Sequence, residues 1–250
     1  TRGSGSPGRA LQGGTDAPNR STRASGFVGR GSIRAVPTLI DVLERAIDRY
    51  GERHAVGIRR DDGSTDHWSY RELGRRARIA AWRLRALDLE PDDRILTWSP
   101  STPELPAAYF GAMYARLVIV PLDLRMSADA VEGIARASGA RHLILGTGRD
   151  APDPREARLE HFPTTTVDDL CAEPAADDPA FPSDWEARQA AWGRPAADEL
   201  FQLVFTSGTT GTPKGVMLTH ANLMHNSASI AYAFEHTRTG RGVFCLPSYH

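Results

Sequence analysis

Residues 206–215 read TSGTTGTPKG, and this stretch decides how the 250-residue chain is interpreted. Its glycines, Gly208, Gly211 and Gly215, allow positive φ angles and a close backbone approach, so successive N–H groups can converge on an anion. Further donors come from hydroxyl groups, which belong to Thr206, Ser207, Thr209 and Thr210. Lys214 is the only lysine of the chain, and its ammonium is a compact, rotatable charge where an arginine would offer a planar fork. The stretch therefore predicts a loop that binds the phosphates of a nucleotide.

Three alternatives to this interpretation fit less well. A solvated turn seldom combines so many hydroxyls, glycines and a lysine between two apolar strands. The Walker A loop of P-loop NTPases opens a helix, whereas Val216–Thr219 is apolar and strand-like. Residues 146–151 formally match the dinucleotide fingerprint, but Pro152 and Pro154 forbid the helix that this fingerprint requires.

Taken with its flanks, the preceding strand Phe201–Phe205 and the following VMLTHANLMHN, the run resembles the phosphate-binding loop of the adenylate-forming superfamily. That superfamily comprises acyl-CoA synthetases, fatty acyl-AMP ligases, luciferases and peptide-synthetase adenylation domains. Weaker matches follow in the right order, WSYREL at 68–73, VPLD at 120–123 and LPSYH at 246–250. The resemblance covers about residues 37–250.

The resemblance implies a reaction and roles for individual residues. A substrate carboxylate attacks the α-phosphate of ATP, pyrophosphate leaves, and the acyl-AMP passes to a thiol of coenzyme A or of a carrier protein. Residues 206–215 would hold the β- and γ-phosphates, with Lys214 neutralising the departing pyrophosphate. Mg²⁺ would enter with ATP, and Thr206 or Thr210 are its candidate contacts. His250 matches the family position beside the acyl and adenylate groups.

Two further positions take their meaning from the same resemblance. Thr219 is expected to cap a helix that begins at His220, and His220 itself is explained as well by packing as by ligand contact. Where the family usually has Ala-Gly before the Val-Pro element, this chain has Ala115-Arg116. A turn normally lined by glycine therefore carries a long cation.

The family's later elements are not among these residues. They are the Tyr-Gly-x-Thr-Glu stretch, the ribose-binding aspartate, the hinge and a second, catalytic lysine, and Lys214 is the only lysine here. No residue of these 250 is thus assigned a catalytic role, and alone they are not expected to catalyse adenylation. Two hypotheses stand, the front part of an acyl-activating ligase or a truncated, non-catalytic nucleotide-binding remnant.

The substrate class follows only from the resemblance. The stretches TWSPSTPEL at 97–105 and LPSYH at 246–250 resemble long-chain fatty acyl-CoA synthetases more than amino-acid adenylation domains, with fatty acyl-AMP ligases close behind. A long-chain fatty acid and coenzyme A are the expected substrates, while the acyl chain length cannot be read.

Composition narrows the function classes. A formal net charge of −1 argues against a dedicated nucleic-acid or acidic-membrane partner. Cys171 and Cys245 lie far apart without metal-ligand spacing, so reduced thiols in the cytoplasm are expected. The longest apolar run, Leu117–Leu122, contains a proline and is far shorter than the roughly 18 to 20 residues of a membrane span.

Residues 1–36 differ from the rest. They hold six arginines, eight glycines and five serines against one acidic residue, Asp16. Such a segment cannot bury enough apolar surface to offset its ordering entropy, so we expect disorder. The composition also fits an organelle transit segment, but the first methionine is Met113, and a partial or mis-started reading frame is the preferred expectation.

From Pro37 onward the pattern predicts an α/β fold. Thr38 can cap a helix that ends before Gly51, with an apolar face of Leu39, Leu43, Ile47 and Tyr50. A hairpin is expected from residues 55–59 and 65–68, turned by Asp61-Asp62-Gly63. Ser69 and Glu72 predict a capping box for the next helix, whose inward residues are expected to be Leu73, Ala77, Ala80, Leu84 and Leu87. Its many arginines are interpreted as a solvated face.

Three strands are then expected to alternate with two helices. The strands are Arg94–Trp98, Leu117–Val120 and Arg141–Leu145, and the helices lie near Pro103–Ala115 and Ala128–Ser138. This β-α-β-α-β order predicts a parallel sheet with helices on its faces.

Four segments are expected. Residues 1–36 form the leader, 37–149 a first α/β subdomain, 150–198 a proline-rich surface connection, and 199–250 the start of a second subdomain with the phosphate loop. The connection holds seven prolines. It is expected to contain one short helix near Asp184–Ala191 and to be anchored by Trp185 and Trp192.

Overall fold

The computed structural model describes residues 37–59, 62–148, 150–206 and 214–233, together with Gly240 and Gly242. The chain divides into two compact units, residues 1–35 and 36–250, and the second unit holds every described residue. The expectations for residues 1–36 therefore lie outside the described residues.

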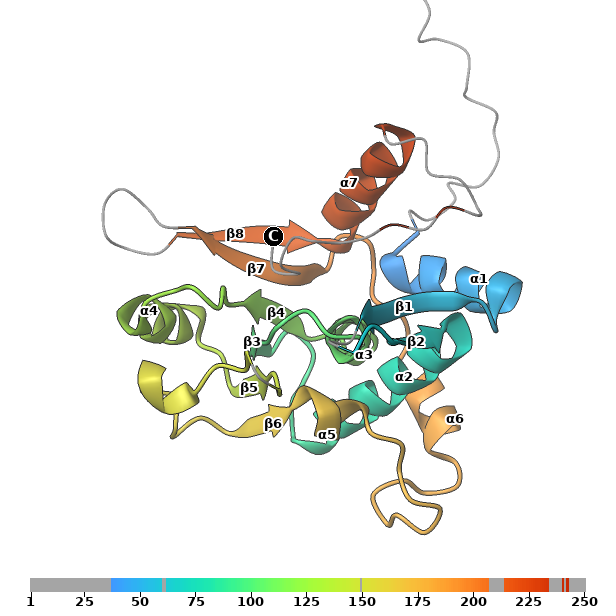
Figure 1. The fold of residues 1–250 in the computed structure, drawn as a ribbon, viewed down its shortest axis with the longest axis horizontal. Coiled ribbons are helices and arrows are strands. Elements are labelled where there is room, and N and C mark those ends of the chain that lie inside the picture. Colours follow the sequence, from blue (N-terminus) through green and yellow to red (C-terminus); the bar gives the residue numbers. More distant parts are fainter. Residues whose placement is uncertain are drawn as a thin grey trace, which may run out of the picture. The chain divides into compact units, whose positions relative to one another are not determined.

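The described residues form an α/β unit (Figure 1). Its helices are α1 (Leu39–Tyr50), α2 (Tyr70–Ala86), α3 (Glu104–Ala115), α4 (Ala128–Ser138), α5 (Val167–Cys171), α6 (Trp185–Ala190) and α7 (His220–Ala233), with a 3₁₀ turn, η1 (Pro154–Ala157). Its strands are β1 (His54–Arg59), β2 (Thr65–Ser69), β3 (Arg94–Trp98), β4 (Val118–Pro121), β5 (His142–Leu145), β6 (Thr164–Thr166), β7 (Leu200–Thr206) and β8 (Lys214–Thr219).

A six-stranded sheet organises this unit, in the order β6-β5-β3-β4-β7-β8. The pairs from β6 to β7 are all parallel, and β8 pairs antiparallel with β7 at the edge. β1 and β2 form a separate antiparallel hairpin. The predicted parallel sheet with flanking helices is confirmed.

Alternating side chains of the central strands point into two different cores. Ile95 and Ile119 belong to a cluster with residues of α1, α2, α3 and α5. Leu96 and Val120, one position further along each strand, belong to a cluster with residues of α4 and η1. Because successive strand residues face opposite sides, the sheet is covered on both faces, as a parallel sheet requires.

Local signals place most helix ends where the sequence predicts them. Thr38 and Asp41 form a full capping box at α1, and Gly51 follows its last residue. At α2 only half of the predicted box forms: Ser69 accepts the N–H of Glu72, while the Glu72 carboxylate binds Arg76 instead.

The expectation that Leu87 faces inward is wrong. α2 ends at Ala86, so Leu87 lies beyond the helix and does not continue its buried face. The residue is 41% exposed. Leu89 is buried nearby, at 3% exposure.

The segment 150–198 is more than the expected surface connection with one helix. The predicted helix is present as α6, but β6 also extends the sheet beside β5, and α5 buries Val167, Leu170 and Cys171 in the core. Trp185 is buried and Trp192 stacks on Trp82 with ring centroids 5.8 Å apart, so both tryptophans act as anchors.

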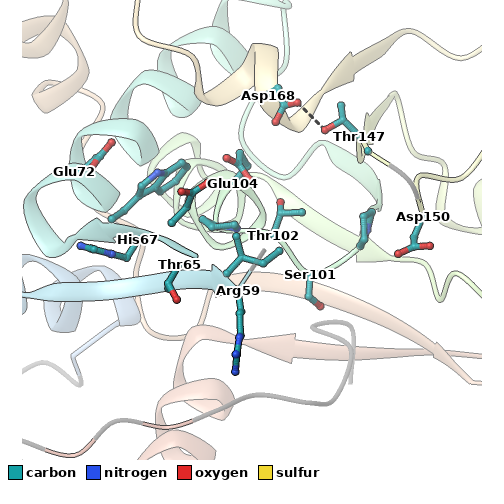
Figure 2. Close-up of a pocket in the computed structure, with 16 residues that line it drawn as sticks. Arg59, Thr65, His67, Glu72, Ser101, Thr102, Glu104, Thr147, Asp150 and Asp168 are labelled. Atoms are coloured by element: carbon teal, nitrogen blue, oxygen red, sulfur yellow. Dashed lines mark hydrogen bonds between the residues drawn. The ribbon is translucent and has the colours of Figure 1, made fainter. Parts of the chain in front are cut away.

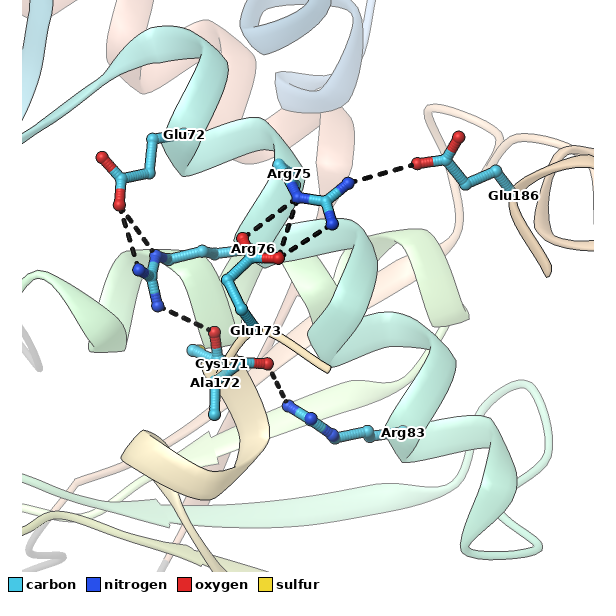
Figure 3. A network of polar contacts seen from close by, with 8 residues as sticks. All are labelled: Glu72, Arg75, Arg76, Arg83, Cys171, Ala172, Glu173 and Glu186. Carbon is cyan, nitrogen blue, oxygen red and sulfur yellow. Dashed lines mark hydrogen bonds and ion pairs between the residues drawn. The ribbon is translucent and has the colours of Figure 1, made fainter. Parts of the chain in front are cut away.

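The arginines of α2 are a solvated face only in part. Arg71 is 66% exposed, whereas Arg75, Arg76, Arg83 and Arg85, here called the α2 arginine face, bind neighbouring parts of the fold. Arg83 Nη1 donates to the carbonyl oxygens of Asp169, Leu170 and Ala172 at 2.7, 3.1 and 2.6 Å. Arg76 donates to the carbonyl oxygen of Cys171, and Arg75 pairs with Glu173 and Glu186 (Figure 3). Arg85 pairs with Glu90 and lies over the ring of Trp192. The face therefore fastens residues 169–192 onto α2.

Among the described residues, none of the helices combines the length and apolarity needed to cross a membrane.

β7 and β8 continue the sheet that the earlier strands begin. The division into subdomains at residues 149, 198 and 199 stays a prediction.

Candidate functional site

The phosphate-loop stretch begins at an edge of the sheet that suits ligand binding. β7 is parallel to β4, so its last residue, Thr206, lies at the edge formed by the carboxyl ends of the parallel strands. This is the edge at which open α/β sheets generally bind ligands. Thr206 is opposite Lys214, the first residue of β8, and both are exposed. The described ends of the loop thus bring together a hydroxyl and the only lysine.

The remaining candidates lie outside the described residues. They are Ser207, Gly208, Thr209, Thr210, Gly211 and His250. The strand predicted after the loop is present as β8 and begins at Lys214 itself. A Walker A loop would place a helix there, so the described geometry agrees with the choice against that motif.

Gly215 is a glycine for a different reason from the predicted one. It lies within β8 opposite Phe205, and its φ is outside the left-handed range. A Cβ at this position would come within 2.8 Å of Leu203 Cδ1 and 3.3 Å of Phe205 Cζ. The residue therefore allows close packing of the β7–β8 hairpin.

The hairpin base is held at Glu199, which precedes β7. Its carbonyl oxygen accepts the N–H of His220, the first residue of α7, at 3.1 Å, and its carboxylate accepts the N–H of Ala196 at 3.0 Å. Thr219 caps α7 as predicted, exchanging hydrogen bonds with Asn222. One residue thus fixes both the entry to β7 and the exit from β8.

His220 is a packed residue at the start of α7. It is 2% exposed, and its ring lies 5.2 Å from the ring of Phe201. Burial lowers the pKa of His220 below its usual value, and the nearby Glu199 opposes this only in part. Both observations favour the packing interpretation over ligand contact.

Arg116 binds Glu199 through two hydrogen bonds. Nε lies 3.0 Å from Oε2 and Nη2 lies 2.9 Å from Oε1. Burial would raise the pKa of Glu199, but the hydrogen bonds from Arg116 and from the Ala196 N–H lower it overall. The same hydrogen bond raises the pKa of Arg116. The sequence showed Arg116 as a departure from the family, but its partner, 83 residues away, carried no sequence signal.

A concavity of about 1060 Å³ lies beyond the carboxyl ends of β3 and β5 (Figure 2). Its described lining includes five carboxylates, those of Asp66, Glu72, Glu104, Asp150 and Asp168, and one arginine, Arg59; Glu72 is also paired with Arg76. Thr147 donates to Asp168 at 2.6 Å across one side of it. This charge disfavours a phosphate or a carboxylate, so the hairpin remains the candidate phosphate site.

A sequence profile of the family described as AMP-binding enzyme matches residues 43–250 of the chain. The chain belongs to the family of AMP-binding enzymes. This agrees with the resemblance carried by the TSGTTGTPKG stretch, and it fixes the adenylate-forming superfamily as the setting of the site.

Three relatives of this AMP-binding enzyme show the breadth of the family. Feruloyl-CoA synthase of an Amycolatopsis species is 30% identical over 204 residues, which cover 79% of this chain and 37% of that protein. Surfactin synthase subunit 2 of Bacillus subtilis is 28% identical over 199 residues, covering 78% of this chain and 5% of that protein. The structure of o-succinylbenzoate CoA synthetase of Bacillus subtilis with an acyl-adenylate intermediate matches with a TM-score of 0.65 and 24% identity, covering 83% of this chain and 50% of that one. The chain thus spans well under half the length of these two curated relatives.

Proposed function

We propose that the intact protein activates a carboxylic acid with ATP to form an acyl-adenylate and pyrophosphate, and then transfers the acyl group to coenzyme A. The observation that carries this proposal is the β7–β8 hairpin, which sets Thr206 opposite Lys214 at the carboxyl edge of a sheet in an AMP-binding enzyme. The Lys214 residue is exposed. An exposed ammonium at this edge of the sheet can bind a phosphate oxygen.

The residues of the loop would act by positioning and by charge. Lys214 would neutralise the negative charge that builds on the departing pyrophosphate, and the Thr206 hydroxyl would donate to a phosphate oxygen or contact Mg²⁺. Ser207, Gly208, Thr209, Thr210, Gly211 and Gly215 complete the proposed phosphate site, with His250 beside the acyl group. When bound, Mg²⁺ supplies further positive charge to the phosphates.

For the acid, we propose a long-chain fatty acid, on the TWSPSTPEL and LPSYH stretches. Two relatives are named for other acids, ferulate and succinylbenzoate. An amino-acid substrate and a carrier-protein acceptor remain the alternatives to this proposal. The cytoplasm is proposed as the compartment. The buried Cys171, whose pKa burial raises to about 12, has the unreactive thiol expected of a structural cysteine.

The test is exchange of labelled pyrophosphate into ATP, measured on the intact protein with a panel of acids: palmitate, ferulate and an amino-acid mixture. Exchange with palmitate supports the full proposal, and exchange with another acid keeps adenylation but replaces the substrate class. Lys214→Ala should lower the rate by about 10² to 10³, by analogy with the loss of one transition-state donor. Lys214→Arg, which keeps the charge but not the compact shape, should lower it less.

Binding of ATP without exchange for any acid would contradict the proposal and favour a non-catalytic nucleotide-binding protein. Coenzyme A and a phosphopantetheinylated carrier protein are then compared as acceptors by detecting the thioester product. A thioester on the carrier protein alone would replace coenzyme A in the proposal.

A further inference from the structure

Arg116 adopts an unusual backbone conformation two residues before β4. It is the C-cap of α3, with φ 60° and ψ 39°, which is the left-handed region. A residue with a Cβ is about 1–2 kcal/mol less stable there than in the right-handed region. Glycine adopts this conformation without that cost. In this chain the backbone N–H groups of Arg116 and Leu117 donate to the carbonyl oxygens of Met113 and Ala112, which stabilises the left-handed cap.

The side chain of Arg116 adds a paired hydrogen bond with Glu199. The two side chains are one third and one quarter exposed, and such bidentate pairs fix orientation as well as charge. Glu199 in turn holds the N–H of His220 and lies one residue before β7. Arg116 therefore joins the end of α3 to the base of the phosphate-loop hairpin.

Packing holds part of the hairpin, because Phe201 is buried in the larger core and Leu203 and Phe205 pack against the second core cluster, while the strand pairing of β7 with the rest of the sheet is limited. β7 is registered against β4 at one position only, Ile119 opposite Gln202. Its pairing with β8 also shifts register between Leu200 and Gln202, next to Glu199. Such an irregularity bends a strand, so the orientation of the hairpin depends on how its base is clamped.

We infer that Arg116 and Glu199 are positioning residues, which orient the β7–β8 hairpin and thereby set where Thr206 and Lys214 meet the phosphates of ATP. This inference rests on the proposed function for its kinetic consequence. Its structural consequence, a fixed orientation of the β7–β8 hairpin, does not depend on which reaction the protein catalyses.

The kinetic test uses Arg116→Gly and Glu199→Gln in the intact protein. Arg116→Gly removes the ion pair while placing the residue best suited to positive φ, so the backbone is not strained by the change. We expect the KM for ATP to rise about tenfold, because a small displacement of a binding group has effects of this order or larger. The KM for the acid should stay the same, and Arg116→Lys should restore part of the ATP affinity.

Arg158 offers a matched control. It is also an arginine in the left-handed region, with φ 56°, and it pairs with Asp129 and Glu132 on the side of α4. Arg158→Gly makes the same chemical change away from the hairpin and should leave both KM values as in the wild type. Equal effects of the two glycine variants, or no effect of Arg116→Gly in a protein that does form adenylates, would overturn the inference while leaving the proposed function standing.

A readout without catalysis separates the two proposals. If the wild-type protein forms no adenylate, the proposed function fails, and hydrogen exchange of peptides covering residues 200–206 and 214–219 decides the inference. Faster exchange there in Arg116→Gly than in Arg158→Gly supports a clamped hairpin. Unchanged exchange in both variants overturns it, and Arg116→Lys serves the same comparison if the glycine variant does not fold.

Discussion

The α2 arginine face and the β7–β8 hairpin use their basic side chains in opposite ways. Arg76 and Arg83 reach carbonyl oxygens 86 to 95 residues away in sequence and are engaged with the fold itself. Lys214 is exposed at the start of β8, a strand whose Val216 and Met217 are 47% and 66% exposed. Sites that bind ligands are commonly drawn from such sparsely packed regions, because they must still respond to what they bind. The number of cations in a region is thus a poor guide to its function. Whether those cations already bind groups of the protein itself is a better guide.

The largest expected effect compares how much a side chain of α2 and a side chain of the β7–β8 hairpin each contribute to the free energy of unfolding. Leu84 of α2 is fully buried in the larger core, so Leu84→Ala should lower the free energy of unfolding by about 2–5 kcal/mol. Met217→Ala on β8 should change it by less than about 0.5 kcal/mol, since exposed substitutions rarely do more. Urea unfolding of both variants measures this difference. A Met217→Ala loss as large as that of Leu84→Ala would show that the hairpin is packed in the protein in solution.

The second prediction concerns the α2 arginine face. Arg83→Met keeps the aliphatic part of the side chain but leaves three carbonyl oxygens without their donor. We expect a loss of about 1–3 kcal/mol in the free energy of unfolding, with faster hydrogen exchange in residues 167–192.

Arg136→Ala is the control for Arg83→Met. Arg136 pairs with Glu132 one helical turn away in α4 and is 76% exposed, so its loss should cost no more than about 0.5 kcal/mol. If the two variants lose the same stability, the face is solvated after all, as the sequence suggested.

The contrast between local and distant contacts also explains what the sequence could predict. Thr38, Ser69 and Thr219 act within three residues of themselves, and all three cap their helices as predicted, although the box predicted at Ser69 forms only in half. β6 was missed because Thr164–Thr166 is short and has no apolar alternation, and its place at the sheet edge comes only from pairing with β5. The pairing of Arg116 with Glu199 and the hydrogen bonds of Arg83 to distant carbonyl oxygens likewise depend on the tertiary fold. The residues of the loop itself stay predictions, since Ser207–Pro213 lie outside the described residues.

The smallest effect compares the two regions by their response to acid. Burial lowers the pKa of His220, at the hairpin base, and of His142, which lies in β5 with Nε2 2.9 Å from Thr165 Oγ1. The unfolded chain, with histidine pKa values near 6.5, takes up protons before the folded protein does. The free energy of unfolding should therefore fall as the pH drops below about 6.5, and the loss is complete once the pH lies below the folded pKa values.

Variants at the two histidines assign this acid response to a region. The urea midpoints at pH 7.5 and 5.5 should differ less in His220→Phe, which keeps the packing on Phe201, than in the wild type. They should also differ less in His142→Gln. The two reductions should add in the double variant, because the residues lie in separate elements. This window stays above the ordinary pKa of Glu199, so the Arg116 pair contributes little to the difference. If hydrogen exchange at pH 5.5 accelerates in β7 and β8 before it does in β5, protonation of His220 opens the hairpin first. Simultaneous acceleration in all three strands would show that the hairpin unfolds only with the core, and the sparse packing that distinguishes it from α2 would then have no consequence for its dynamics.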